Sequence, residues 1–234
     1  MEPIARYATK AEPGDGWHTG PGREMASRKR VKIDTLNASH PQVAHAVKMA
    51  REWAKRKREG FEDASMILSG PFGTGKTHIA KAILWSMTVQ PEGLDGHAVP
   101  AGRFYLANDL MQRLAPTRSR ETGIVDTLRP SNLVGNAPIV VVDDVGGEQQ
   151  MAYVGKENQQ QEFHARYFRF IDHCYTVMTS VIITTNLSIA GLGESDFAQH
   201  IGGRAFDRLA QMAPKGFMVG LGDVPSWRQK EGGR

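Results

Sequence analysis

The sequence predicts an α/β protein built on a five-stranded parallel sheet with helices on both faces. Five short runs rich in β-branched and aromatic residues alternate with longer stretches whose apolar residues recur at helical spacing. The chain has 234 residues, enough for one sizeable domain and a tail but few for two domains. The expected strands are Ser65–Ser69, Arg103–Leu106, Ile139–Val142, Val181–Thr185 and Phe217–Val219.

Residues 1–35 are rich in glycine, proline and charge and have no periodicity, so we expect a flexible basic arm there. Residues 36–234 are expected to form one folded domain. That domain opens with a helix for which Pro41 suits the first turn and Gly60 suits the end. Its apolar positions recur every three or four residues, at Val43, Ala46, Val47, Ala50, Trp53 and Ala54.

The segments between the strands differ in character. His78–Ser86 is helical in pattern, whereas Pro91–Gly102 and Pro116–Ala137 are predicted to be loop-rich surface insertions. The helix before the fourth strand has one apolar stripe, and the cysteine on it is expected to be buried filler. Few residues follow the fifth strand, so no full C-terminal lid domain is expected. The stripe consists of Phe163, Tyr167, Phe170, Ile171 and Cys174.

Composition excludes several classes of protein. A single cysteine rules out an internal disulfide and a cysteine-based zinc cluster. No apolar run is long enough to span a membrane and the N-terminus has no apolar signal core, so we expect a cytoplasmic protein. The net charge is +4 and unevenly distributed, with two basic clusters that suit either nucleic acid or a solvated surface equally well. The clusters are Arg23, Arg28, Lys29, Arg30 and Lys32, and Lys55, Arg56, Lys57 and Arg58.

The string GPFGTGKT lies between the first expected strand and the helix after it. Its glycines let the backbone wrap closely enough for N–H groups to point at phosphate oxygens, and the helix N-terminus adds its dipole. Lys76 is expected to reach the β- and γ-phosphates of ATP, and the Thr77 hydroxyl to bind Mg²⁺. The expected nucleotide contacts are Gly70, Pro71, Phe72, Gly73, Thr74, Gly75, Lys76, Thr77 and His78.

Two acidic residues follow the apolar strand Ile139–Val142, in the string APIVVVDDVGGE. Such a strand delivers its last residues to the carboxyl edge of the sheet, where ligands of open α/β sheets bind. Asp143 is therefore expected to bind Mg²⁺, directly or through a water. Asp144 is expected to polarise the attacking water as a general base.

Polar side chains in two further strings complete the expected site. Asn186 ends the strand in VIITTNLS, where its amide could orient the hydrolytic water rather than only form a turn. Arg204 and Arg208 in GGRAFDRLAQ lie one helical turn apart and share a face. An arginine on such a face could reach a phosphate held by a neighbouring subunit and stabilise transition-state charge.

Taken in order, these strings resemble the DnaC/IstB branch of the AAA+ ATPases, which includes bacterial and phage helicase loaders and transposase helpers. The resemblance covers about Leu36 to Arg228. Its motifs are LNASHPQVAHAVKMAREWA, GPFGTGKTHIAKAI, FYLANDLMQRL, VVVDDVGGE, IITTNL and RAFDRLAQ with the closing GFMVGLGDVPSWR.

The resemblance implies a P-loop NTPase with a RecA-like AAA+ core, assembled as a ring or open spiral with ATP between subunits. Lys76, Thr77, Asp143, Asp144 and Asn186 would then act within one subunit. Arg208, or otherwise Arg204, would act on the neighbour's nucleotide. The chain departs from the wider AAA+ pattern because its second acid is Asp144 rather than glutamate, which suits slow hydrolysis. Without a lid domain, a sensor role for Arg228 does not carry over.

Three functions follow from the resemblance. The first is a replication protein, a loader that binds single-stranded DNA and a replicative helicase and has DNA-stimulated ATPase activity. The second is an IstB-like transposase helper acting on duplex DNA, and the third is a nucleotide-dependent oligomerising adaptor. Single-strand binding would use a basic channel with aromatic residues, although aromatics on a strand more often belong to the core. The candidates are Arg103, Phe104, Tyr105, Arg113, Arg118 and Arg120.

Overall fold

A computed structural model gives the structure of the chain. It describes residues 33, 36, 38–60, 64–89, 99–100, 102–115, 117–118, 125–126, 129–135, 137–147 and 157–227. Most of the predicted arm, residues 1–35, lies outside the described residues, and so does its basic cluster. Within that segment, Ile33 is buried in a hydrophobic core, and Leu36, the first residue after the segment, packs against the same core. The packed domain therefore extends at least to Ile33.

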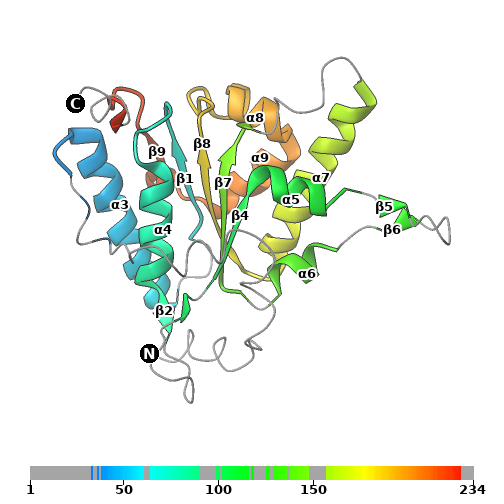
Figure 1. The fold of residues 1–234 in the computed structure, drawn as a ribbon, viewed down its shortest axis with the longest axis horizontal. Coiled ribbons are helices and arrows are strands. Elements are labelled where there is room, and N and C mark those ends of the chain that lie inside the picture. The colour runs from blue at the N-terminus through cyan, green and yellow to red at the C-terminus, as the bar shows by residue number, and fades with distance from the viewer. Residues whose placement is uncertain are drawn as a thin grey trace.

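A five-stranded sheet with all strands parallel forms the centre of the fold (Figure 1). The strand order is β4-β7-β8-β1-β9, so β1 lies between β8 and β9. This confirms the predicted α/β fold class and number of strands. The strands are β1 (Met66–Ser69), β4 (Arg103–Leu106), β7 (Ile139–Val145), β8 (Ser180–Thr185) and β9 (Met218–Gly220).

Helices cover both faces of this sheet, and two small antiparallel strand pairs lie apart from it. The pairs are β2 (Thr88–Val89) with β3 (Val99–Pro100), and β5 (Thr117–Arg118) with β6 (Val125–Asp126). The α-helices are α3 (Pro41–Arg58), α4 (Lys76–Ser86), α5 (Ala107–Arg113), α6 (Pro130–Val134), α7 (Glu157–Thr176), α8 (Asp196–Ile201) and α9 (Gly203–Met212). Short 3₁₀ turns are η3 (Leu192–Glu194) and η4 (Lys215–Phe217).

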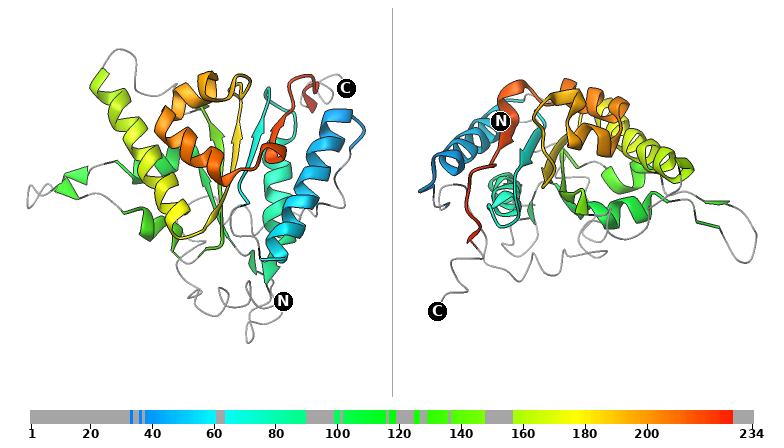
Figure 2. Two further views of the ribbon diagram at one scale, coloured as in Figure 1. Left: turned by 180° about the vertical axis from the view of Figure 1, so that it is seen from behind. Right: turned by 90° about the horizontal axis from the view of Figure 1, so that it is seen from above.

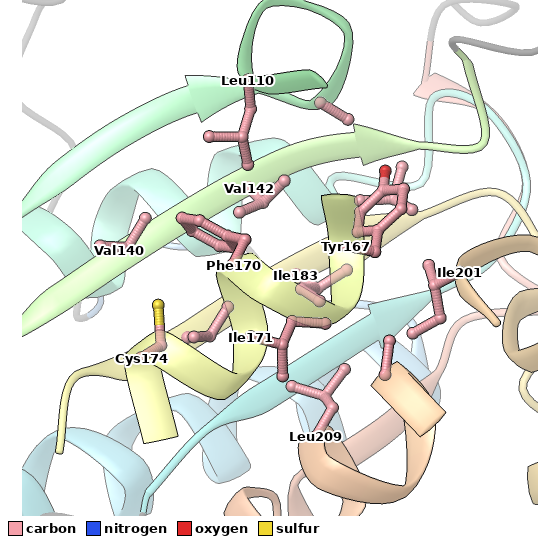
Figure 3. Close-up of a cluster of buried hydrophobic side chains, with 14 of the residues drawn as sticks. Leu110, Val140, Val142, Tyr167, Phe170, Ile171, Cys174, Ile183, Ile201 and Leu209 are labelled. Carbon is pink, nitrogen blue, oxygen red and sulfur yellow. The ribbon is translucent and has the colours of Figure 1, made fainter. Parts of the chain in front are cut away.

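Alternation along the buried strands divides the interior into two cores. Met66 and Leu68 of β1 face α3 and α4, while Ile67 between them faces α5, α7 and α9. Figure 3 shows the second core, where side chains of α7 meet those of β7, β8 and α9. In both Figures 1 and 2, α3 and α4 lie together at one side of the molecule and α7 lies at the other.

The predicted stripe of α7 is confirmed, because Phe163, Tyr167, Phe170, Ile171 and Cys174 are all buried. Burial also raises the pKa of the Cys174 thiol, so this sulfur packs as an apolar group and is not a thiolate.

The predicted lead-in helix is confirmed as α3, with Pro41 at its start and Gly60, at φ 91°, just beyond its end. Its basic cluster is partly structural. Lys57 is buried, Arg56 lies over the Phe217 ring at 5.8 Å, and Arg58 donates to the Ser86 carbonyl at 3.0 Å. Arg56 and Arg58 thus contact neighbouring segments and Lys57 is buried, a packing role that neither expectation, nucleic-acid patch or solvated surface, included.

Most predicted strand ends match the structure to within a single residue, and three differences are larger. α4 begins at Lys76, two residues before the expected His78, because helical hydrogen bonds start at Gly75. β7 runs on to Val145 instead of ending at Val142. The loop-rich insertion predicted over Pro116–Ala137 also contains the short strands β5 and β6 and the short helix α6, which is anchored by the buried Leu133 and Val134. No helix among the described residues is both long and apolar enough to cross a membrane.

Candidate nucleotide-binding site

The loop from Gly70 to Gly75 connects the buried strand β1 to α4 at the carboxyl edge of the sheet. Gly73 and Gly75 have φ of 77° and 94°, the left-handed region that side chains disfavour. A Cβ on Gly73 would also stand 2.1 Å from the Ser226 hydroxyl oxygen. The conformation therefore requires glycine at Gly73, and a larger residue would also displace the Ser226 hydroxyl.

Lys76 begins α4, and its side chain turns back into the loop. Its ammonium donates to the carbonyls of Gly70 at 2.6 Å and Pro71 at 2.7 Å, and to Asn186 Oδ1 at 2.9 Å. The residue is only 7% exposed, so these bonds fix the charge within the loop. Phe72, at the crest of the loop, is in contrast 62% exposed.

Asp143 follows the buried run Ile139–Val142 of β7, is itself buried, and faces the first turn of α4. Thr77 Oγ1 donates to its carboxylate at 2.9 Å, and Thr184 Oγ1 of β8 donates to the same oxygen at 2.5 Å. Burial raises the pKa of Asp143, while these two hydroxyl hydrogen bonds and the charge of Lys81 act in the opposite direction. The protein thus buries a carboxylate beside a threonine hydroxyl at the end of a parallel strand.

Asp144 points its exposed side chain out of the same strand end. Its backbone has φ 62°, a left-handed conformation that is uncommon outside glycine. Asn186, just after β8, donates to Asp144 Oδ1 at 2.8 Å while its own oxygen accepts from Lys76. One amide therefore joins the loop lysine to the second acid, and the structure brings together Lys76, Asp144 and Asn186.

The other predicted loop residues surround this network. Thr74 is buried and its hydroxyl donates to the Pro71 carbonyl at 3.0 Å, which closes the turn of the loop. His78 lies in the first turn of α4 with an exposed side chain.

Arg204 and Arg208 lie apart from this network, on the face of α9 that meets α7. The Arg204 guanidinium stacks 4.2 Å from the Phe168 ring centroid, and Arg208 stacks 4.3 Å from that of Tyr175. Arg208 also pairs with Asp172 at 3.1 Å. Both arginines hold α9 against α7, and Arg208 is the more firmly held of the two. Arg228 lies outside the described residues.

Three of the residues suggested for single-stranded DNA, Arg103, Phe104 and Tyr105, contact neighbouring parts of the fold. Arg103 donates to the carbonyls of Asn132 and Leu133, and the Tyr105 hydroxyl also donates to Leu133. Phe104 packs on the first core beneath Lys81. These contacts favour the core interpretation of this strand. The side chains of Arg118 and Arg120 lie outside the described residues.

Sequence patterns did not indicate two features of the site. One is Thr184, whose hydroxyl touches both acidic residues; its only signal is its place two residues before Asn186. The other is the segment after β9, which lies against the loop. Leu221 N–H donates to the Ser69 carbonyl at 2.7 Å, and Trp227 N–H donates to that of Gly73 at 3.0 Å.

The donor set suits a nucleotide with Mg²⁺. A lysine ammonium and the N-terminus of a helix attract phosphate, while a threonine hydroxyl beside a carboxylate offers the hard oxygen ligands that Mg²⁺ takes. With the strand order, this arrangement defines a AAA+ type P-loop protein that binds ATP. A family model described as IstB-like ATP binding protein matches residues 60–213, and the chain belongs to this family.

Solved structures share the fold at low sequence identity. The DnaC helicase loader is 22% identical over 81% of this chain and 96% of its own, with a TM-score of 0.54. DnaI is 15% identical over 87% of this chain and 92% of its own, with a TM-score of 0.56. AMPPCP-bound DnaA from Aquifex aeolicus is 18% identical over 78% of this chain and 48% of its own, at 0.50. No curated protein sequence matches the chain.

Asp143→Asn tests how much the buried carboxylate lowers the free energy of unfolding. Because the pKa is raised, ionising Asp143 costs more in the folded than in the unfolded chain, and stability falls as pH rises through this pKa. Asparagine has no charge to bury and still accepts from Thr77 and Thr184. We expect the variant to melt at a higher temperature at about pH 7, by roughly 2–4 °C per kcal/mol of cost removed, with a smaller gain near pH 4.

Thermal melts across this pH range, without added nucleotide, provide the measurement. Asp172→Asn serves as the control, since it removes a carboxylate that is half-exposed and ion-paired, and no gain is expected from it. A lower melting temperature for Asp143→Asn at neutral pH would contradict the account.

Proposed function

We propose that this chain is an ATPase that hydrolyses Mg·ATP at the carboxyl edge of its sheet and acts as a DnaC-like helicase loader. The observation on which this rests is the link from Lys76 through Asn186 to Asp144 beside the Thr77–Asp143 pair. A phosphate-binding cation, a water-orienting amide and a base are thereby held within one hydrogen-bonded network, next to a metal-binding hydroxyl.

Each residue has a distinct part in the proposed reaction. The loop N–H groups and Lys76 bind the phosphates, and Thr77 with Asp143 holds Mg²⁺, which neutralises phosphate charge when bound. Asn186 orients a water towards the γ-phosphorus, and Asp144 accepts the water's proton as the new P–O bond forms and the bond to the β-phosphate oxygen breaks. Asp144 is exposed and so is accessible to water.

The proposed partner is inferred from the comparisons with known proteins and not from the geometry of the site. The fold shared with the DnaC helicase loader and DnaI supports a loader of a replicative helicase. We propose that it acts in the cytoplasm and that single-stranded DNA is its second partner. The IstB-like family model favours the alternative, a transposase helper that acts on duplex DNA. Binding to matched single-stranded and duplex oligonucleotides at several salt concentrations separates the two, and no binding to either would favour an adaptor.

Two variants test the ATPase proposal. Asp144→Asn should bind Mg·ATP with normal affinity but hydrolyse it about 10²–10⁴-fold more slowly, because an amide cannot accept the proton. Asparagine tolerates a left-handed backbone, so the geometry at φ 62° is kept. Lys76→Ala should instead weaken ATP binding about 10–100-fold, because a charged hydrogen bond is lost.

Steady-state phosphate release and titration with a fluorescent ATP analogue measure these two effects, with circular dichroism to check the fold. Asp144→Asn hydrolysing ATP at the wild-type rate would rule out Asp144 as the base. Unchanged analogue affinity in Lys76→Ala would rule out the loop as the phosphate site.

We further propose that subunits assemble head to tail and that α9 supplies an arginine to the neighbour's nucleotide. Arg208 would have to give up its ion pair with Asp172, whereas Arg204 would give up only its stack on Phe168, which supports testing Arg204 beside it. Replacing the acting arginine by alanine should leave ATP binding intact and slow hydrolysis about 10³-fold.

Mixing tests this assignment. The arginine variant has an intact loop and Lys76→Ala has an intact arginine, so mixed assemblies contain some complete sites and should regain activity. Asp172→Asn is the matched control because it removes the ion pair and keeps Arg208; it should hydrolyse ATP normally. Mixed activity equal to the average of the two variants, for both arginines, would contradict action in trans.

A further inference from the structure

The strands β7 and β8 lose their register at the two acidic residues. Val142 pairs with Ile183 and Val145 pairs with Thr185, so Asp143 and Asp144 together oppose the single residue Thr184. This is a β-bulge, in which an extra residue interrupts the ladder of backbone hydrogen bonds and bends the strand. The bulge allows two consecutive residues to serve the same site, with Asp143 buried and Asp144 exposed.

Threonine hydroxyls take over the hydrogen bonds that the bulge interrupts. Thr184 Oγ1 donates to Asp143 Oδ1 at 2.5 Å and accepts from the Asp144 backbone N–H at 2.9 Å. Thr185 Oγ1 donates to the Val145 carbonyl at 2.7 Å and accepts from Leu187 N–H at 3.0 Å. Thr184 is 1% exposed, so water does not replace either of its bonds.

We propose that Thr184 is a positioning residue for the ATPase site, whose single hydroxyl fixes the side chain of Asp143 and the backbone of Asp144 together. The inference rests on the proposed function and names the residue that holds its two acids in register. Thr184 is neither acid nor base in the reaction. It acts through Asp143, which faces the metal-binding Thr77, and through Asp144, whose carboxylate meets Asn186.

The chemistry of the hydroxyl explains why other side chains would not serve. A hydroxyl is both a donor and an acceptor, and here one group uses both capacities at once. Valine has nearly the same shape but offers neither, so it would leave Asp144 N–H without its acceptor and Asp143 Oδ1 with Thr77 as its remaining hydroxyl donor. Serine keeps both capacities and loses only a methyl group.

Four variants test the proposal. Thr184→Val and the smaller Thr184→Ala remove the hydroxyl, so the second carries the test if the first does not fold. Thr184→Ser restores the hydroxyl. Thr179→Val is the matched control, since Thr179 is equally buried just before β8, at the opposite edge of the sheet, and its hydroxyl makes one bond, to the Ala137 carbonyl at 2.9 Å.

Three readouts are informative: kcat and KM for ATP, the affinity for a fluorescent ATP analogue with Mg²⁺ or with EDTA, and the hydrogen-exchange rate of the Asp144 amide by NMR. Without the hydroxyl, we expect kcat and the Mg²⁺-dependent gain in affinity to fall about 10–100-fold, as for other residues that orient metal ligands. Affinity in EDTA should stay unchanged, and the Asp144 amide should exchange faster. Thr184→Ser and Thr179→Val should resemble the wild type in all three.

Unchanged Asp144 exchange in both variants that lack the hydroxyl would overturn the proposal, and so would Thr184→Ser being as impaired as Thr184→Val. Failure of the proposed function has a different signature. A folded wild type without Mg²⁺-dependent nucleotide binding would overturn the ATPase assignment, and the Asp144 exchange rates would still decide whether Thr184 holds the bulge.

Discussion

Parallel pairing of β8 with β1 on one side and β7 on the other is the constraint on which the site depends. Parallel neighbours end at the same edge of a sheet, so the loop after β1, the acids of β7 and the amide after β8 meet there. Lys76 and Asp144 are far apart in sequence, and Asn186, the residue beyond β8, connects them. A different strand order would separate the same side chains.

The irregular backbone and the buried charge of the site lower the stability of the fold, and packing in the two cores offsets this loss. A buried carboxylate at Asp143, a left-handed backbone at Asp144 and a bulge in β7 each lower stability. The flanking β7 and β8 segments are almost fully buried, and α3, α4, α7 and α9 pack on them from both faces. Strained positions persist where the surrounding packing fixes them, and here they coincide with the residues of the proposed chemistry.

Sequence patterns predicted the fold and most residues of the candidate site because both depend on residue periodicity and short motifs within single segments. Alternating strands and helices predicted the parallel sheet, and the glycine loop placed Lys76 and Thr77. Asp143, Asp144 and Asn186 follow two apolar runs, and this position predicted that they meet at one edge of the sheet. The structure places them there.

Other features are set by contacts between distant segments and leave no local pattern. The bulge that lengthens β7 depends on Thr184 of the neighbouring strand β8. α6 is too short for periodicity to reveal and is fixed by burial of Leu133 and Val134. The basic run at the end of α3 looked like a surface, yet Arg56 and Lys57 pack inward because long side chains bury their aliphatic stems.

The central claim is that Mg·ATP binds where Lys76, Asn186 and the Thr77–Asp143 pair converge. A crystal structure with Mg²⁺ and a non-hydrolysable ATP analogue tests this most directly. The account predicts the terminal phosphate in contact with Lys76 Nζ and Asn186, and the metal in contact with Thr77 Oγ1 on the side of Asp143. Phosphates bound away from the Gly70–Thr77 loop, or a metal held without Thr77, would contradict it.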